Sequence, residues 1–194
     1  MNFKKHFHNL DKEVTMKKTI LASVLALLAT SAHAQLYGEV GYTWLTAKQN
    51  VNGNEFKGKP NAIRAIVGFD LQRNLAVEGM VALGVRDGDL KVNGQTISGV
   101  KLKVDNAVGV YLKPKARLND SFEVFGRVGV ARVEGTGSAP GFGSIRDSES
   151  SLSWGAGLSY AVTQAVGLNV DYMQYANKDG FKANGFTVGV GMRF

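Results

Sequence analysis

Apolar and polar residues alternate along almost the whole chain after residue 34. From Phe186 to Phe194 every even position is apolar, and the odd positions carry Gly, Thr or Arg. Successive side chains of a strand point to opposite faces, so this pattern predicts strands with one apolar and one polar face. Helical periodicity is nearly absent. Eight strands are predicted, with the approximate spans Gln35 to Ala47, Asn61 to Leu71, Leu75 to Val85, Val100 to Lys113, Ser121 to Val133, Ser151 to Ala161, Ala165 to Tyr175 and Gly185 to Phe194.

The predicted strands are close to the length of about 9 to 11 residues that crosses a bilayer when tilted. Their connections alternate between short and long, and all three prolines fall in them. The long, polar connections are Lys48 to Pro60, Arg86 to Gly99, Glu134 to Ser150 and Ala176 to Asn184. Short turns at one end and long loops at the other are typical of outer-membrane barrels. The pattern therefore predicts an all-β fold, an eight-stranded antiparallel up-and-down transmembrane barrel.

The two faces of the predicted strands differ in charge. One face has no charged residue, whereas the other carries Glu39, Arg64, Asp70, Glu78, Asp105, Glu123, Arg127, Asp171 and Arg193. A Lys or Arg facing lipid near the midplane costs about 2–4 kcal/mol, so a bilayer would enforce this separation. A soluble barrel of the lipocalin type is the alternative, with the charged face outside.

Aromatic residues favour the membrane over the soluble alternative. Following the strands up and down places aromatic rings of the uncharged face at two levels, one near each rim. The two groups are Phe69, Phe122, Tyr160 and Phe194 near the short turns, and Trp44, Trp154, Tyr172 and Phe186 near the long loops. Two belts of rings mark the two membrane interfaces.

The first 34 residues have the features of a secretory signal peptide. Met16-Lys17-Lys18 precedes a short apolar run, and Ala32-His33-Ala34 is an A-x-A-like cleavage site. We expect translation to start at Met16, cleavage after Ala34 and a barrel domain over 35–194. An uncleaved N-terminal anchor is the alternative.

Charge and cysteine content exclude several classes of protein. Without residues 1–34 the chain has 18 Lys and Arg against 14 Asp and Glu, so its net charge falls from +7 to +4. No basic stripe with interleaved aromatics remains, so no nucleic-acid partner is expected. The chain has no cysteine, which excludes disulfides and thiolate metal sites.

Three segments carry a resemblance to a known family. They are Tyr37-Gly38-Glu39-Val40-Gly41-Tyr42-Thr43-Trp44, Phe125-Gly126-Arg127-Val128-Gly129-Val130 and Val188-Gly189-Val190-Gly191-Met192-Arg193-Phe194. With the leader, they resemble the small OmpA/OmpX-type eight-stranded outer-membrane β-barrels of Gram-negative bacteria, also called the porin family. The resemblance implies an integral protein of the outer membrane. It also implies that the alternating C-terminal residues Phe186, Val188, Val190, Met192 and Phe194 form the signal that the outer-membrane assembly machinery recognises.

The inward charges are the strongest candidate for chemistry. Six of them are predicted to form an ion-pair network across the lumen: Glu39, Arg64, Glu78, Asp105, Arg127 and Asp171. Such a network can be a structural plug, because an eight-stranded barrel is just wide enough to be filled by side chains. It can also be a gate that opens a narrow ion path when the arginines exchange partners, as the resemblance suggests.

Enzymatic activity is not expected. Small outer-membrane barrels with hydrolase or acyltransferase activity use a His as base or orienting group. The histidines of this chain are His6, His8 and His33, all upstream of the predicted cleavage site. No cofactor and no metal site are therefore predicted.

The outer rim and the loops suggest partners. Lys48 and Arg132 are predicted to face outward at the long-loop rim, where they could contact lipopolysaccharide phosphates, although rim charges are often simply solvated. The predicted function is that of a monomeric, structural, surface-display barrel. The alternatives are an OmpX-like adhesin or immune-evasion factor that binds a host ligand through its loops, and a low-conductance pore.

Overall fold

The computed structural model of the protein describes residues 36–51, 53–139, 143–178 and 180–194. The barrel belongs to the second of two units of the chain, Gln35–Phe194. The predicted leader, with its start at Met16 and its cleavage site after Ala34, lies outside the described residues and stays a prediction. Among the described residues, no helix is long and apolar enough to cross a membrane.

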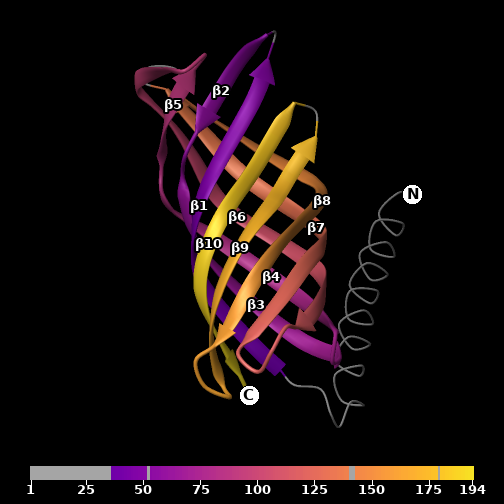
Figure 1. Ribbon diagram of the computed structural model, residues 1–194. Coiled ribbons are helices and arrows are strands. Elements are labelled where there is room, and N and C mark those ends of the chain that lie inside the picture. Colours follow the sequence, from indigo (N-terminus) through magenta and orange to yellow (C-terminus); the bar gives the residue numbers. More distant parts are fainter. Residues whose placement is uncertain (1–35, 52, 140–142, 179) are drawn as a thin grey trace, which may run out of the picture. The chain divides into compact units, whose positions relative to one another are not determined.

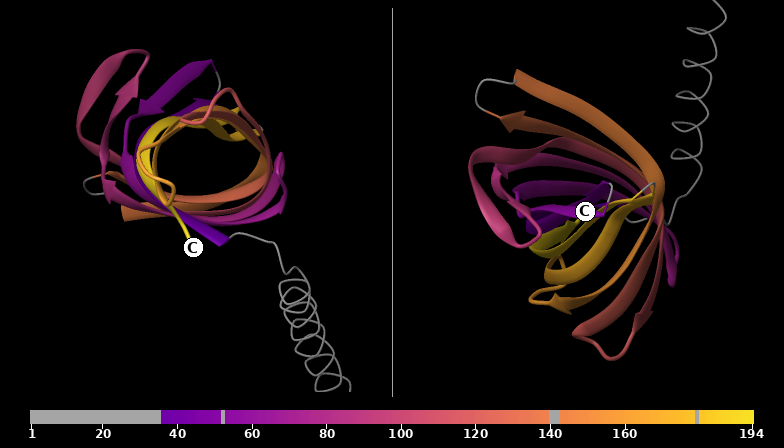
Figure 2. Two further views of the ribbon diagram at one scale, coloured as in Figure 1. Left: turned by 60° about the horizontal axis from the view of Figure 1, so that its bottom comes forward. Right: turned by 90° about the horizontal axis from the view of Figure 1, so that it is seen from above.

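Ten antiparallel strands are found in the described residues (Figure 1). They are β1 (Leu36–Val51), β2 (Asn54–Gly58), β3 (Asn61–Gln72), β4 (Leu75–Arg86), β5 (Gly88–Val92), β6 (Gln95–Arg117), β7 (Phe122–Ala139), β8 (Gly143–Ala161), β9 (Val166–Lys178) and β10 (Phe181–Arg193). Neighbouring strands pair in the order β10-β9-β8-β7-β6-β4-β3-β1, and a β10–β1 pairing closes the ring (Figure 2, left). The predicted barrel of eight antiparallel strands is confirmed.

The short strands β2 and β5 extend the barrel rather than adding to its circumference. The first half of β1 pairs with β3, and its end pairs with β2. In the same way β6 pairs first with β5 and then with β4. Because β2 also pairs with β5, the ring still has eight strands beyond the ends of β3 and β4. The chain leaves the ladder at Pro60, which has no N–H to donate; its carbonyl accepts from the Leu45 N–H at 3.0 Å.

The prediction of four long loops is wrong, because the strands run on beyond the predicted spans. The β5–β6 hairpin closes on Asn93 and Gly94, whose φ angles of 49° and 86° match a two-residue hairpin turn. The turn is held to β2 because the Asn93 side chain accepts from the Glu55 N–H at 3.0 Å and donates to Asn54 at 2.9 Å. Most of the residues expected to be loop are therefore paired β-structure.

Two further sequence expectations are corrected in β6. Pro114 is predicted to lie in a connection, but it lies in the strand opposite Leu75, with its side chain exposed. The alternation in the predicted strand Val100 to Lys113 predicts that Val104 faces outward with the other uncharged residues, but Val104 is buried. The cause is a β-bulge in β6. Val104 is opposite Gly135 and Asn106 is opposite Glu134, so Asp105 is an extra residue without a partner position in β7. The residues of β6 that precede the bulge therefore have the opposite parity to those that follow it.

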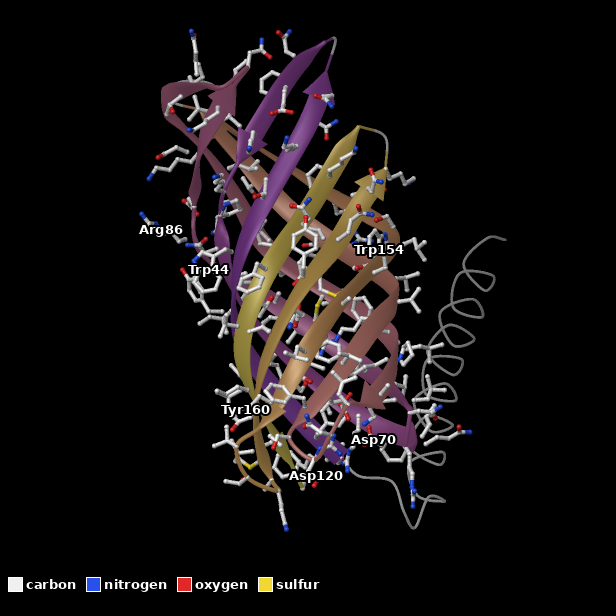
Figure 3. The ribbon with its side chains drawn as sticks, viewed as in Figure 1. Trp44, Asp70, Arg86, Asp120, Trp154 and Tyr160 are labelled. Carbon is white, nitrogen blue, oxygen red and sulfur yellow. The ribbon has the colours of Figure 1, made fainter. Side chains whose placement is uncertain are left out.

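The uncharged face lies outside the barrel and the charged face inside. Val67 and Leu152 are 61% and 63% exposed, whereas Arg127 and Glu78 are 2% and 1% exposed. The aromatic residues lie at two levels: Trp44 and Trp154 toward the long hairpins, and Tyr160 toward the short turns (Figure 3). A soluble lipocalin-type barrel requires the opposite arrangement, so that alternative is wrong.

Candidate functional site

Arg127 of β7 is the centre of a charge cluster inside the barrel. Its guanidinium Nε lies 2.5 Å from a carboxylate oxygen of Glu78 on β4. Its two terminal nitrogens lie 2.7 Å from Glu39 on β1 and 2.9 Å from Asp171 on β9. Alternation along each strand turns all four side chains inward, and ring closure brings them to one level. The four strands are therefore linked across the lumen by one side chain.

Arg64 of β3 completes the cluster on the side of β9. It donates a forked pair of hydrogen bonds to Asp171, one at 2.8 Å and a second, shorter one. The same guanidinium donates to the Tyr175 hydroxyl at 3.1 Å. Asp171 thus accepts from two arginines, which compensates for the burial of its charge.

The third cation of the cluster is Lys113 of β6, which is not among the six residues predicted for the network. Its ammonium lies 2.9 Å from Glu39 and 3.2 Å from Glu78. It also lies 4.8 Å and 4.4 Å from the ring centroids of Tyr37 and Phe125. The Tyr37 hydroxyl donates to Glu78 at 2.7 Å. The sequence did contain the signal, since position 113 has the inward parity of its strand.

The cluster contains three cations and three carboxylates: Arg64, Lys113, Arg127, Glu39, Glu78 and Asp171. Its formal charges cancel. Every buried side-chain nitrogen and oxygen among the described residues has a hydrogen-bond partner. Complete pairing of this kind is what keeps buried charges tolerable, and it fixes each strand relative to its neighbours.

Asp105 does not belong to this cluster, so that part of the predicted network is wrong. It accepts a hydrogen bond from the Thr136 hydroxyl at 2.6 Å and lies 3.4 Å from the Lys103 ammonium. It lies eight positions before Lys113 in β6, which is roughly 26 Å along an extended strand. The bulge at this residue was not visible in the alternation of apolar and polar positions.

A second group of charges lies toward the short turns. Lys115 and Asp70 are 2.6 Å apart, and Arg193 lies 3.3 Å from Asp70 and 3.8 Å from Glu123. A cavity of about 480 Å³ opens at this end; Glu39 and Lys113 of the central cluster are among its lining residues. The central cluster is therefore reached from the short-turn mouth of the barrel.

On the opposite side of the cluster the lumen is filled with apolar side chains. They include the buried Tyr111, Met173, Tyr175 and Leu45, packed with Val104, Val133 and several alanines. A pocket among these side chains has a volume of about 20 Å³, which is the room needed by a single water. The lumen is thus closed twice, by paired charges and by an apolar layer.

The predicted rim residues Lys48 and Arg132 face outward but do not form one site. Lys48 of β1 lies 3.1 Å from Glu55, and Arg132 of β7 donates to the Ser148 hydroxyl at 2.9 Å. Three strands separate β1 from β7 in either direction around the ring of eight, so the two residues lie on opposite sides of the barrel.

The residues of the predicted assembly signal lie on the outward face of the last strand, except Phe194, which directly follows it. All five are exposed: Phe186, Val188, Val190, Met192 and Phe194. The strand β10 is paired with β9 on one side and β1 on the other, so it is the strand that closes the ring. Its recognition by the assembly machinery remains a prediction.

Comparison with known proteins agrees with this architecture. The family model described as "Outer membrane protein beta-barrel domain" matches residues 19–194. No curated protein compared with the chain matches it significantly.

Two solved structures illustrate the fold. The crystal structure of Ail, the attachment invasion locus protein of Yersinia pestis, is 19% identical, with a TM-score of 0.61, and covers 83% of this chain and 99% of its own. The crystal structure of Neisserial surface protein A is 15% identical, with a TM-score of 0.63 and the same coverage. At these identities the likeness concerns the fold alone.

Proposed function

Because the chain belongs to the outer membrane protein beta-barrel domain family, a family of the bacterial outer membrane, we propose that it is a non-conducting, non-enzymatic scaffold for surface display. In this proposal the barrel spans the membrane as a monomer and holds four β-hairpins outside the cell. The orientation follows from the short turns, which face the periplasm in such barrels. The closed ring supports the monomer, since a closed barrel has no unpaired edge strand.

The observation that carries the proposal is the double closure of the lumen. A gate that opens when arginines exchange partners would need Arg127 to leave three carboxylates for other partners at the same level. The guanidinium nitrogens of Arg127 lie 2.5 Å, 2.7 Å and 2.9 Å from the oxygens of these carboxylates. Breaking such a buried set leaves uncompensated charge, which is strongly unfavourable. The apolar layer would still block the path. We therefore favour the plug over the gate and the low-conductance pore.

The test is single-channel recording in planar bilayers. The wild-type protein is expected to give no discrete channel events, and the rim variant Arg132→Ala serves as a control that leaves the cluster intact. Stable channel events in the wild-type protein that Arg127→Ala alters but Arg132→Ala does not would contradict the plug and establish the gate.

The non-enzymatic part of the proposal is supported by the position of the histidines. All three, His6, His8 and His33, precede the predicted cleavage site. The carboxylates of the cluster are engaged by cations, so none is placed as a general base. Hydrolysis of a lipid or peptide by the purified, folded protein, lost in Glu39→Gln, would overturn this part.

A second candidate function is adhesion. It is favoured by the hairpins themselves, because paired β-structure presents side chains in fixed positions, and by the fold shared with Ail, which has been crystallised with the heparin analogue sucrose octasulfate. Replacing residues 92–95 at the β5–β6 tip by a Gly-Ser turn should abolish binding to host cells or matrix if adhesion is the function. Unchanged binding, with the barrel still folded, would exclude this hairpin as the adhesive element.

A further inference from the structure

Four lysines stand in one row across four neighbouring strands at the rim of the barrel. Lys91 of β5 is opposite Lys57 of β2, Lys57 is opposite Lys48 of β1, and Lys48 is opposite Lys182 of β10. Residues that are directly opposite in a ladder point to the same face. At a strand spacing of about 4.8 Å, the row is roughly 15 Å long.

The row lies on the outward face, just beyond the aromatic belt. Lys48 and Lys182 each lie four residues from a belt residue on the same strand, Trp44 and Phe186, whose rings are 6.2 Å apart. Four residues rise about 13 Å along a strand and roughly 10 Å along the normal of a tilted barrel. Since the belt marks the edge of the hydrocarbon, the row is level with the headgroups of the outer leaflet.

Fold stability does not explain this arrangement. Like charges directly opposite each other destabilise a sheet, and the row contains three such pairs. Within the part of the chain that the structure describes, Lys48 is the member of the row with a carboxylate in ion-pair distance, Glu55 at 3.1 Å. The row therefore has a surplus of positive charge at a level where the membrane carries anionic groups.

We propose that the row Lys91-Lys57-Lys48-Lys182 binds the phosphate groups of lipopolysaccharide in the outer leaflet. Lipopolysaccharide phosphates lie at the headgroup level and carry more than one negative charge. Bound between the four ammonium groups, they would offset the repulsion between neighbouring lysines. The site replaces the predicted pair Lys48 and Arg132, of which Arg132 lies on the opposite side of the barrel. It rests on the proposed outer-membrane orientation of the barrel.

The experiment compares two quadruple variants in folded, detergent-solubilised protein titrated with labelled lipopolysaccharide. The row variant changes Lys48, Lys57, Lys91 and Lys182 to Gln. The matched control makes the same change in charge at scattered exposed positions, Arg86, Lys101, Arg132 and Lys178. The row variant should lose tenfold or more in affinity, while the control stays within about twofold. Equal losses in both variants, or none in the row variant, would overturn the proposal.

The chemistry is tested with altered ligands. Lipopolysaccharide stripped of its phosphates should bind the wild-type protein as weakly as the intact lipid binds the row variant. Equal binding of both lipids, equal binding of phosphatidylglycerol vesicles, or full competition by inorganic phosphate would each contradict a lipopolysaccharide site.

A stability measurement separates binding from a structural role. In phosphatidylcholine bilayers the row variant should unfold at the same or a higher urea concentration than the wild type, because repulsion is removed. Added lipopolysaccharide should raise the wild-type midpoint and leave that of the row variant unchanged. A row variant that is less stable without lipopolysaccharide would show that the lysines serve the fold. Heat-modifiable gel mobility, retained in all variants, shows that the barrel itself is intact.

Discussion

Charged side chains gather in two regions of this barrel, inside the lumen and along the outer rim, and the two are built in opposite ways. In the lumen three cations meet three carboxylates, and each group has partners on other strands. At the rim lysines face lysines across the ladder. The lumen cluster is complete without a ligand and serves the fold, whereas the rim row is compensated by an external anion.

The strongest test of this contrast is removal of the central cation. Arg127→Ala leaves the buried Glu39 and Glu78 with Lys113 as their one shared cation, and loss of one member of a buried charge set costs about 3–5 kcal/mol. We expect a much lower urea midpoint, or failure to reach the heat-modifiable folded form. The exposed control Arg132→Ala should change the stability by less than about 0.5 kcal/mol. A tolerated Arg127→Ala would mean that the cluster does not hold the barrel together.

The second test places a charge where neither region has one. Val67 is 61% exposed on the outward face of β3, between the two aromatic levels. Val67→Arg should destabilise the barrel in bilayers by about 2 kcal/mol, because Arg on a lipid face costs about 2–4 kcal/mol at the midplane and less toward the interfaces. Urea unfolding in vesicles measures the effect, and Gln72→Arg, at the short-turn end of the same strand, is the control. Equal effects at the two positions would argue against a hydrocarbon surface at Val67.

The third test measures how tightly the lumen charges are coupled. Lys113 and Glu39 are buried 2.9 Å apart, so the double change to Ala should cost less than the sum of the single changes. We expect a coupling of about 1–3 kcal/mol from the four unfolding free energies. The corresponding cycle for the exposed pair Lys178 and Glu149, also 2.9 Å apart, should give less than about 1 kcal/mol. Similar coupling energies in the two cycles would contradict the proposed difference between lumen and rim charges.

Much of the barrel could be predicted because strand parity is a local property. Alternation assigned Glu39, Arg64, Glu78, Arg127 and Asp171 to the lumen, and the structure places all five in the cluster. It also gave the eight strands of the ring and the uncharged outer face. Each of these depends on neighbouring residues within one strand.

The errors arose where pairing with another strand sets the parity or the register, and where a strand continues beyond its predicted end. Asp105 was misplaced because a bulge against β7 shifts the register at that point. Lys113 was left out because the predicted strand ended there, although β6 runs to Arg117. The lysine row was not predicted, because cross-strand register beyond Ala47 follows from tight turns, such as Asn93-Gly94, in segments expected to be loops.

The smallest predicted effect is a change in stability whose sign differs between the rim row and the lumen cluster. Lys57→Glu puts a carboxylate between Lys48 and Lys91 and turns two like-charge pairs into opposite-charge pairs, each worth about 0.2–1 kcal/mol. Stability in lipopolysaccharide-free bilayers should therefore rise slightly, although a charge has been reversed. Lys101→Glu is the matched control; it turns the opposite-charge pair with Asp89 into a like-charge pair and should lower stability by a similar amount. With lipopolysaccharide present the order should reverse, because Lys57→Glu weakens the phosphate site that the wild type fills. If Lys57→Glu were destabilising in both membranes, the rim lysines would, like the lumen charges, belong to the fold.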